Sequence, residues 1–391
     1  MVKYICKRVL LALFILLGVS LILYVLLRCM PLSYVETKFY GSNPNAQDNY
    51  AQLYTQLANC SLADTNDSDE SVFLHGLDRN EQPTEVEIEP GAPLYRTDKD
   101  GNIVYRLKDN GDYEKTSSGD LIPEVEEMPI MKGYFKWLVA CFRGDLGTSW
   151  KYGSPVGDVI FKNMGISFMI AFVSLILELA IAIPLGIKSA CNQYGKLDYA
   201  ATVLTMIGIS FPSFFFGSLM IKIFAVDLGW FPSTGIQSST ITADTSGWVV
   251  FGDMAWHLVL PIFVMVVLSV GSVMRYTRTN TLEVLSADYI RTARAKGLSE
   301  RSVVYKHAFR NTMIPLVTML AGTLPGLFGG AMITENIFSI PGIGKVAYDA
   351  LLEGDIPFVM GYNMFIAVLT VAGILLTDIM YAVVDPRVKL S

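Results

Sequence analysis

The chain has 391 residues, of which 52% are hydrophobic and 17% are charged, and its mean hydropathy is +0.42. Soluble domains carry roughly 25% charged residues, so this composition excludes an ordinary soluble globular protein and favours a membrane protein. The net charge of −6 is unevenly divided, because residues 31–130 contain 20 acidic and 7 basic residues, whereas the remainder contains 16 and 23. We therefore expect these two parts to face different compartments.

A membrane-spanning helix needs about 20 mainly apolar residues, and the sequence predicts six such segments. They cover residues 9–27, 165–187, 201–224, 257–275, 313–335 and 361–384. The first segment is longer than the apolar part of a cleaved signal peptide, and no A-x-A cleavage site follows it. We therefore interpret it as a retained span.

The distribution of lysine and arginine orients the six segments, because these residues accumulate in cytoplasmic loops. They occur before the first span, between the second and third, between the fourth and fifth, and after the sixth. The remaining loops are acidic or poor in basic residues. One topology satisfies every loop: both termini are cytoplasmic, and the acidic residues 31–130 lie outside.

The acidic segment 31–130 contains frequent turn signals, including NPN, DKDGN, KDNGD and SSGD. Between them, residues 93–97 and 102–108 predict two short strands joined by a hairpin turn at Asp100–Gly101. We expect a small extracytoplasmic domain that is partly β. A disordered acidic loop is the alternative, because residues 61–71 contain few apolar side chains.

The next segment, PIMKGYFKWLVACFRG at 129–144, is amphipathic and rich in aromatic residues. It predicts a helix on the outer membrane surface, within an interfacial segment at 131–160. The cysteines show no CxxC or metal-binding spacing. Cys60 and Cys141 both fall outside the membrane in this topology, and a disulfide between them is an alternative to two free thiols.

Charged residues within spans are costly and therefore candidates for function. Glu178 lies deep in the second predicted span, where it could line a substrate path, be protonated, or bond a neighbouring helix. We expect Lys222 to extend toward the outer interface, and Asp378 to form a structural bond near the inner end of the sixth span.

Several catalytic motifs are missing from the sequence. HExxH and GxSxG do not occur, and the stretch PGIGKV at 341–346 lacks the first glycine and the final Ser/Thr of a Walker A motif. The three histidines have no partners at metal-binding spacing. We therefore expect no enzymatic activity, no bound cofactor and no metal site in this chain.

The loop between the fourth and fifth spans, residues 276–312, is basic and helical in pattern. It predicts two short helices, the first ended by Gly297 and the second begun by Ser299. Tyr289, Ala293 and Gly297 follow one another at intervals of four residues, and we expect them to form a shallow surface for a partner protein. Binding to anionic lipid headgroups is the alternative.

This loop resembles the EAA loop of ABC importer permeases, in the sequences DYIRTARAKGLS and HAFRNTMIPL. The blocks GDLGTSW, FPSFFFG, ENIFSIPGIGK and DPR resemble the dipeptide, oligopeptide and nickel branch of that family, in its first-permease (B-type) subunits. The acid of the EAA motif falls at Arg291, its alanines at Thr292 and Ala293, and its glycine at Gly297. The resemblance implies an ATPase-coupling loop of Tyr289, Arg291, Thr292, Ala293, Arg294, Ala295, Lys296, Gly297 and Leu298.

The resemblance implies an all-α membrane protein with six transmembrane helices, like a type I ABC importer permease. The extracytoplasmic, partly β insertion between helices 1 and 2 is longer than the loop expected in many members of the family, and the resemblance does not give its role. The expected parts are an N-terminal tail and first helix at 1–30, the insertion at 31–130, the interfacial segment at 131–160, and the permease core at 161–391. Phe338, Ile340, Pro341 and Gly342 fall at an outer gate or binding-protein contact, with a plain interfacial loop as the alternative.

The same resemblance implies a function in ATP-driven import of di- or oligopeptides across the cytoplasmic membrane of a prokaryote. The expected partners are a second, paralogous permease, two ATPase subunits that bind ATP and magnesium, an extracytoplasmic binding protein and membrane lipid, but no nucleic acid. Nickel or another small solute is the alternative substrate. A proton-coupled secondary transporter that uses Glu178 and a membrane sensor with residues 31–130 as its ligand module are alternatives of other classes.

Overall fold

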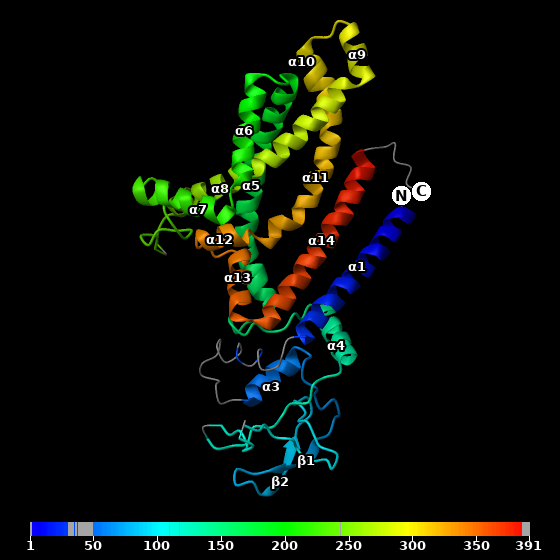
Figure 1. Cartoon of the computed structure of the whole chain (residues 1–391), viewed down its shortest axis with the longest axis vertical. Coiled ribbons are helices and arrows are strands. Elements are labelled where there is room, and N and C mark those ends of the chain that lie inside the picture. Colours follow the sequence, from blue (N-terminus) through cyan, green and yellow to red (C-terminus); the bar gives the residue numbers. More distant parts are fainter. Residues whose placement is uncertain are drawn as a thin grey trace. The chain divides into compact units, whose positions relative to one another are not determined.

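The computed structural model describes residues 2–29, 35, 37, 50–108, 110–116, 118–242 and 244–384 (Figure 1). The chain divides into two compact units. The first contains Met1–Ile15, Phe161–Tyr348 and Ile366–Ser391, and the second contains Leu16–Ile160 and Asp349–Phe365. Helices α1 (Val2–Arg28), α5 (Val156–Cys191), α13 (Ile343–Glu353) and α14 (Ile356–Val384) contribute residues to both units.

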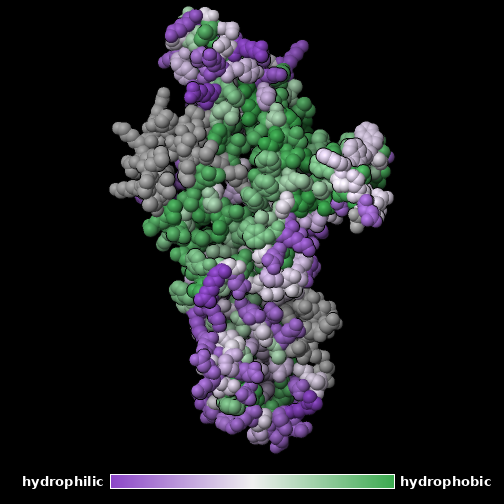
Figure 2. Space-filling model, turned by 180° about the vertical axis from the view of Figure 1, so that it is seen from behind, coloured by the Kyte–Doolittle hydropathy of each residue, from purple (hydrophilic) through white to green (hydrophobic). Residues whose placement is uncertain are grey.

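The first unit is helical. Besides its parts of the shared helices, it contains α6 (Lys196–Ser210), α7 (Ser213–Met220), η2 (Ile221–Asp227), α8 (Gly247–Ser286), α9 (Asp288–Ala295), α10 (Glu300–Ser302), η3 (Val303–Ala308), α11 (Phe309–Gly329) and α12 (Met332–Ile337). Hydrophobic residues cover much of the surface of these helices, whereas the segment 50–128 of the second unit is largely hydrophilic on the face displayed (Figure 2).

Within the described residues, four helices are long and apolar enough to cross a membrane. They are Lys7–Arg28 of α1, the whole of α5 and α8, and Ile356–Asp378 of α14. A fifth is added if α6 and the segment Ser213–Asp227 form one bent span. The six spans predicted from the sequence are therefore not all found by this criterion, although α11 occupies most of the predicted fifth segment.

The third predicted span, 201–224, is not a continuous helix. Lys196–Ser210 and Ser213–Asp227 meet at an angle of 100°. Pro212 lacks a backbone N–H and disfavours the helical conformation of the residue before it. Accordingly, Phe211 is extended, with φ −79° and ψ 131°. Hydropathy alone could not reveal this bend, because it sums apolar character without regard to direction.

Glycines allow the backbones of α5, α6 and α8 to approach closely. A Cβ atom at Gly186 would lie 2.7 Å from the carbonyl oxygen of Met274, and one at Gly208 would lie 2.7 Å from that of Val267. Such contacts between helix backbones are typical of membrane helix packing, where small residues form the interfaces. They fix α5 and α6 against α8 in the first unit.

The second unit contains α3 (Tyr50–Asn59), a two-stranded antiparallel sheet and α4 (Ile130–Phe142). The strands are β1 (Val72–Leu77) and β2 (Pro83–Ile88), with Phe73 opposite Glu87. The hydrophobic core joins α3 and α4 to the last turns of α1 through Tyr24, Tyr54 and Trp137. The residues that we predicted as a helix at 129–144 therefore form α4.

The strands predicted at 93–97 and 102–108 are not a sheet. These residues form isolated bridges, whereas the sheet lies at 72–88. Instead, three backbone segments are joined by a cycle of hydrogen bonds. Leu94 N donates to Asp64 O (2.9 Å), Asp64 N donates to Glu126 O (2.8 Å), and Glu126 N donates to Leu94 O (2.9 Å). Each segment divides its hydrogen bonds between two neighbours, so no continuous ladder forms. The expected turn is present, with Gly101 at φ +84°.

Candidate functional site

The loop that contains α9 and α10 has the caps expected from its sequence. Gly297 adopts φ +76° directly after α9, and its N–H donates to the carbonyl oxygen of Arg294 at 2.9 Å. The hydroxyl of Ser299 accepts from the N–H of Ser302 at 3.4 Å. The second helix is not uniform, since α10 passes through the π-helical η3 into α11.

Ala293 does not lie on an exposed docking surface, so that part of the prediction is wrong. Its side chain is buried with Ile290, Val303 and Ala308 in the hydrophobic core of the loop. The reason is the amphipathicity of α9, whose apolar positions 290 and 293 are three residues apart and share one face. Of the nine predicted coupling residues, the other eight are exposed: Tyr289, Arg291, Thr292, Arg294, Ala295, Lys296, Gly297 and Leu298.

The exposed surface of the loop combines apolar and cationic side chains. Tyr289, Leu298 and Tyr305 are large hydrophobic residues that remain 40–50% exposed. Arg294 is bound to Glu300 at 2.9 Å across the Gly297 turn. Arg291, at the position of the motif's acid, is more exposed, and the carboxylate of Asp288 lies 4.0 Å from it. Such a surface is suited to a partner with apolar pockets and acidic groups.

Of the site residues predicted in the loop at 335–344, Phe338, Ile340 and Gly342 are buried in the first unit, whereas Pro341 is exposed. Phe338 and Ile340 are fully buried in a cluster with Phe216 and Leu258. The N–H of Gly342 donates to the carbonyl oxygen of Ile340 at 2.8 Å, which forms the tight turn around Pro341. These residues anchor the loop, and their role as an outer gate or binding-protein contact stays a prediction.

Glu335 organises this loop and was missed in the sequence. Its buried carboxylate accepts hydrogen bonds from the N–H groups of Ala331 (2.9 Å) and Lys345 (3.0 Å). A side chain at Gly342 would collide with this carboxylate and with the hydroxyl of Ser167, which itself accepts from Ile343 N at 2.8 Å. The signal that could have identified it is an acidic residue close to the apolar pair Ile337–Phe338.

Asp355 was also missed, and it fixes the GDLGTSW block. Its fully buried carboxylate accepts from the N–H groups of Trp150 (3.1 Å) and Lys151 (3.1 Å) and from the hydroxyl of Ser149. It also accepts from Phe358 N at 3.2 Å, as the N-cap of α14. The signal in the sequence is an aspartate followed by Ile-Pro, since proline is favoured in the first turn of a helix.

Glu178 lies on α5 and is half-buried. The hydroxyl of Ser269 on α8 donates to the carbonyl oxygen of Met265 at 2.8 Å, so the bond of Glu178 to a neighbouring helix stays a prediction. An apolar hollow of about 550 Å³ lies between α5 and α8, lined by residues that include Leu177 and Ile181 but not Glu178. A role for Glu178 in a substrate path stays a prediction.

The other charged residues singled out in the spans form ion pairs. Lys222 is exposed and pairs with Asp227 at 2.9 Å. Asp378 pairs with Arg8 at 3.1 Å, which links α14 to α1 within the first unit. Both observations agree with the interfacial position expected for Lys222 and the structural bond expected for Asp378.

Cys60 and Cys141 are free thiols in the structure, so the disulfide alternative is wrong. Burial raises the pKa of each thiol to about 12. Among the residues that the structure describes, His, Cys, Asp and Glu form no group that could bind a metal ion.

The sequence of the chain is similar to a known family and to several known proteins. Residues 182–390 match the family described as "Binding-protein-dependent transport system inner membrane component". The chain is 41% identical over 257 residues to the oligopeptide transport system permease protein AppB of Bacillus subtilis (strain 168), covering 66% of this chain and 79% of AppB. It is 34% identical over 263 residues to the dipeptide transport system permease protein DppB of the same organism, covering 67% and 80%.

Similarity extends to a putative peptide permease protein of Brucella suis biovar 1 (strain 1330), with 36% identity over 266 residues, covering 68% of this chain and 82% of the relative. Among solved structures, an inward-facing form of the MetNI methionine ABC transporter matches with a TM-score of 0.43 and 19% identity, covering 58% of this chain and 96% of that chain.

Proposed function

The chain belongs to the family of binding-protein-dependent transport system inner membrane components, and from this premise we propose that it is the peptide-conducting permease subunit of an ATP-driven importer. The observation that carries the substrate class is the 41% identity to an oligopeptide permease over most of that protein's length. The long apolar helices support a multi-pass membrane protein.

The segment 288–316 couples the permease to cytoplasmic ATPase subunits in this proposal. Its exposed Tyr289, Leu298 and Tyr305 supply apolar contact, and Arg291 supplies a cation at the edge of α9. The internal core formed by Ala293 and its neighbours makes the loop a compact body, so that movement of a docked ATPase can be passed into α8 and α11. ATP and magnesium are bound by the partner subunits.

We propose the orientation that the basic loops favour, with both termini and α9 in the cytoplasm and residues 31–130 outside. The importer contains a second, paralogous permease, two ATPases and an extracytoplasmic substrate-binding protein. The acidic insertion is placed to meet that binding protein at the outer face of the cytoplasmic membrane of a prokaryote.

Co-purification of the complex from its native membrane tests the coupling proposal. Leu298→Asp should release the ATPase subunits, because a carboxylate replaces an exposed apolar contact on the loop. Leu107→Asp is the matched control, since Leu107 is exposed in the insertion, and this variant should retain the ATPases. Retention of the ATPases and of full transport by Leu298→Asp would contradict the assignment of the docking surface.

Transport by vesicles containing the whole complex tests the substrate. ATP-dependent uptake of a labelled tripeptide is expected, and nickel uptake without peptide uptake would favour the alternative small-solute permease. If uptake follows an imposed proton gradient without ATP, the secondary-transporter alternative is correct. Glu178→Gln then tests a substrate-path role for Glu178, because only such a role changes the apparent affinity for peptide.

The sensor alternative predicts ligand binding to the insertion without transport. Complexes that bind peptide in the presence of the binding protein but show no ATP-dependent flux would support it. Flux at a rate that depends on the binding protein would exclude it.

A further inference from the structure

Helix α4 presents three different faces around its circumference. Gly133, Tyr134, Trp137 and Leu138 are buried on the first face. Lys132 and Lys136 lie one turn apart on the second face. The third face has only large apolar side chains, at Met131, Phe135, Val139 and Phe142, which follow one another at helical spacing. Each face has a different neighbour, and the three neighbours together indicate where the helix lies relative to α1, the insertion and the membrane.

The buried face packs against the outer part of α1. The Tyr24 ring lies 5.9 Å from the ring of Tyr134 and 6.0 Å from that of Trp137, measured between centroids. The hydroxyls of Tyr134 and Ser20 are 2.9 Å apart. Because a side chain at Gly133 would collide with the Tyr24 hydroxyl, the two helices approach as closely as a glycine permits.

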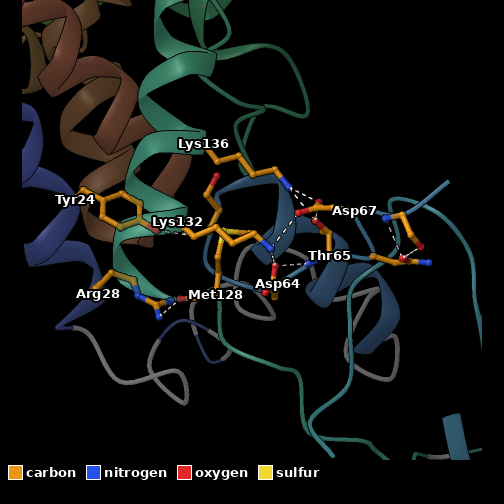
Figure 3. Close-up of polar contacts among 11 residues, drawn as sticks. Tyr24, Arg28, Asp64, Thr65, Asp67, Met128, Lys132 and Lys136 are labelled. Atoms are coloured by element: carbon orange, nitrogen blue, oxygen red, sulfur yellow. Dashed lines mark hydrogen bonds and ion pairs between the residues drawn. The ribbon is translucent and has the colours of Figure 1, made fainter. Parts of the chain in front are cut away.

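The lysine face holds the insertion (Figure 3). Lys132 Nζ lies 2.7 Å from Asp64 and 3.0 Å from Asp67, and Lys136 Nζ donates to the hydroxyl of Thr65 at 2.8 Å. Arg28, at the end of α1, donates to the carbonyl oxygen of Met128 at 2.6 Å. The lysines of α4 are therefore engaged by protein carboxylates rather than directed toward lipid phosphates.

The apolar face remains uncovered by the part of the chain that the structure describes. Phe135 is 56% exposed and Phe142 is 68% exposed. Met131, near the start of the helix, and Val139, between the two phenylalanines, are exposed as well. Four adjacent large apolar side chains in water would be unfavourable. We therefore expect something other than the described part of the chain to cover them.

Lipid is the occupant that the neighbouring helix indicates. Residues 7–28 of α1 form the most apolar of the candidate spans, with mean hydropathy 3.0. In the same turns as Tyr24, Ile22 and Leu26 are 60% and 61% exposed, as expected of residues that face lipid. α4 packs against these turns, so its own uncovered apolar face continues a surface that already faces the bilayer.

We propose that α4 lies in the outer lipid–water interface, with Met131, Phe135, Val139 and Phe142 in contact with lipid and with Lys132 and Lys136 fixing the insertion to that surface. An interfacial helix of this kind buries its apolar face at the boundary between headgroups and acyl chains. The helix thus sets the height and orientation of the insertion above the membrane. This inference rests on α1 being a span and is independent of which solute the proposed importer carries.

Photocrosslinking in the assembled complex tests the lipid contact. Phe135 and Phe142 are replaced, one at a time, by p-benzoylphenylalanine, and the complex is reconstituted in nanodiscs of phosphatidylethanolamine and phosphatidylglycerol. After irradiation, the intact mass of the chain should show phospholipid adducts at both positions. Leu26 is the positive control on α1, and Phe73, which is 61% exposed on β1, is the matched control that should give no such adduct.

An adduct with another polypeptide chain at Phe135 would show that a protein covers this face and would overturn the proposal. A phospholipid yield at Phe135 no greater than that at Phe73 would overturn it as well. Neither result depends on transport, so failure of the proposed function is measured separately by peptide uptake.

The role of the lysines is tested in the same nanodiscs with the double variant Lys132→Ala, Lys136→Ala. Phospholipid adducts at Phe135 should persist, whereas amide hydrogen exchange at residues 62–67 should become roughly tenfold faster as the attachment opens. Lys99→Ala, at an exposed lysine of the insertion, is the control and should leave both readings unchanged. Unchanged exchange in the double variant would contradict the proposed attachment.

Discussion

Asp198, in the first turn of α6, binds the guanidinium of Arg278 on α8 through two hydrogen bonds of 2.6 and 2.7 Å. The aspartate also accepts from the N–H of Tyr194 at 2.9 Å, so it holds the turn before α6 as well. The side chain of Asp198 is only 5% exposed, so water cannot replace Arg278 as the partner of its carboxylate. The pair holds the first turn of α6 to α8, and the backbones of these two helices are already in close contact.

Removal of one member of this pair should therefore destabilise the protein strongly. Arg278→Ala is expected to lower the free energy of unfolding by on the order of 3 kcal/mol, since it leaves a buried carboxylate without its cation. Thermal unfolding of the purified complex in detergent measures the effect. Arg275→Ala is the control, because Arg275 is exposed on the same helix. Equal melting temperatures for the two variants would contradict this role of the pair.

Asp355 should be more sensitive to alanine than to asparagine. Asp355→Ala leaves the N–H groups of Trp150, Lys151 and Phe358 without their acceptor, and each buried donor left unsatisfied costs roughly 1–3 kcal/mol. Asp355→Asn keeps one side-chain oxygen and should be intermediate. The yield of monodisperse protein from the membrane is the measurement, with Glu353→Ala, at an exposed neighbour, as the control. An alanine variant that accumulates like the control would contradict the prediction.

The attachment of the insertion to α4 should survive moderate acid. Hydrogen bonds from Thr65 and Lys132 lower the pKa of Asp67 from 3.8 to about 2. A lowered folded-state pKa gives a stabilisation that is complete above the unfolded-state pKa and is lost as the pH falls from 3.8 through about 2. The difference in melting temperature between wild type and Asp67→Asn should thus be constant from pH 7 to 5 and shrink below about pH 4.

The control for this titration is Asp69→Asn, at an exposed aspartate two residues further along the chain. It should show little difference from wild type at any pH. A difference for Asp67→Asn that grows as the medium is acidified would contradict the assigned direction.

Gly133 should tolerate no side chain. In Gly133→Ala the new methyl group would lie 2.6 Å from the carbonyl oxygen of Ser61 and would collide with the Tyr24 hydroxyl, which donates to that oxygen at 2.6 Å. The melting temperature should fall. Gly157→Ala is the matched helical control, because a Cβ there has open space around it, and it should be neutral or stabilising by up to roughly 1 kcal/mol. The reverse order of stabilities would show that α1 and α4 are less tightly packed.

Cys60 and Cys141 should be unreactive toward alkylating reagents in the folded protein. Since burial raises the pKa of each thiol to about 12, each has roughly a thousandfold less thiolate at pH 8 than a thiol of pKa 9. Peptide mass mapping after brief iodoacetamide treatment should show modification of the exposed Cys29 first. Denaturation should make Cys60 and the partly buried Cys141 reactive, and a persistent lack of reaction would indicate a disulfide.

The local sequence was sufficient for the helical elements and several of their ends. Long apolar runs determine α1, α5, α8 and α14. Each run is long enough to span a membrane, and a helix satisfies the backbone hydrogen bonds of the run within itself. Gly297 and Ser299 identify the turn between α9 and α10 from the sequence alone, because a helix cap acts on residues within one helical turn of it. The family follows from blocks of consecutive residues.

Tertiary structure decided which faces of these elements are buried and which distant groups they meet. Ala293 is inside the loop because Val303 and Ala308 pack over it, and Asp355 is a buried acceptor because Ser149, more than 200 residues earlier, reaches it. The bridges of Tyr95 and Tyr105 depend on Val125 and Pro123, which lie 30 and 18 residues further along the chain. Periodicity gives the faces of a helix or strand but not their neighbours, because the neighbours are set by the packing of segments that are remote in the sequence.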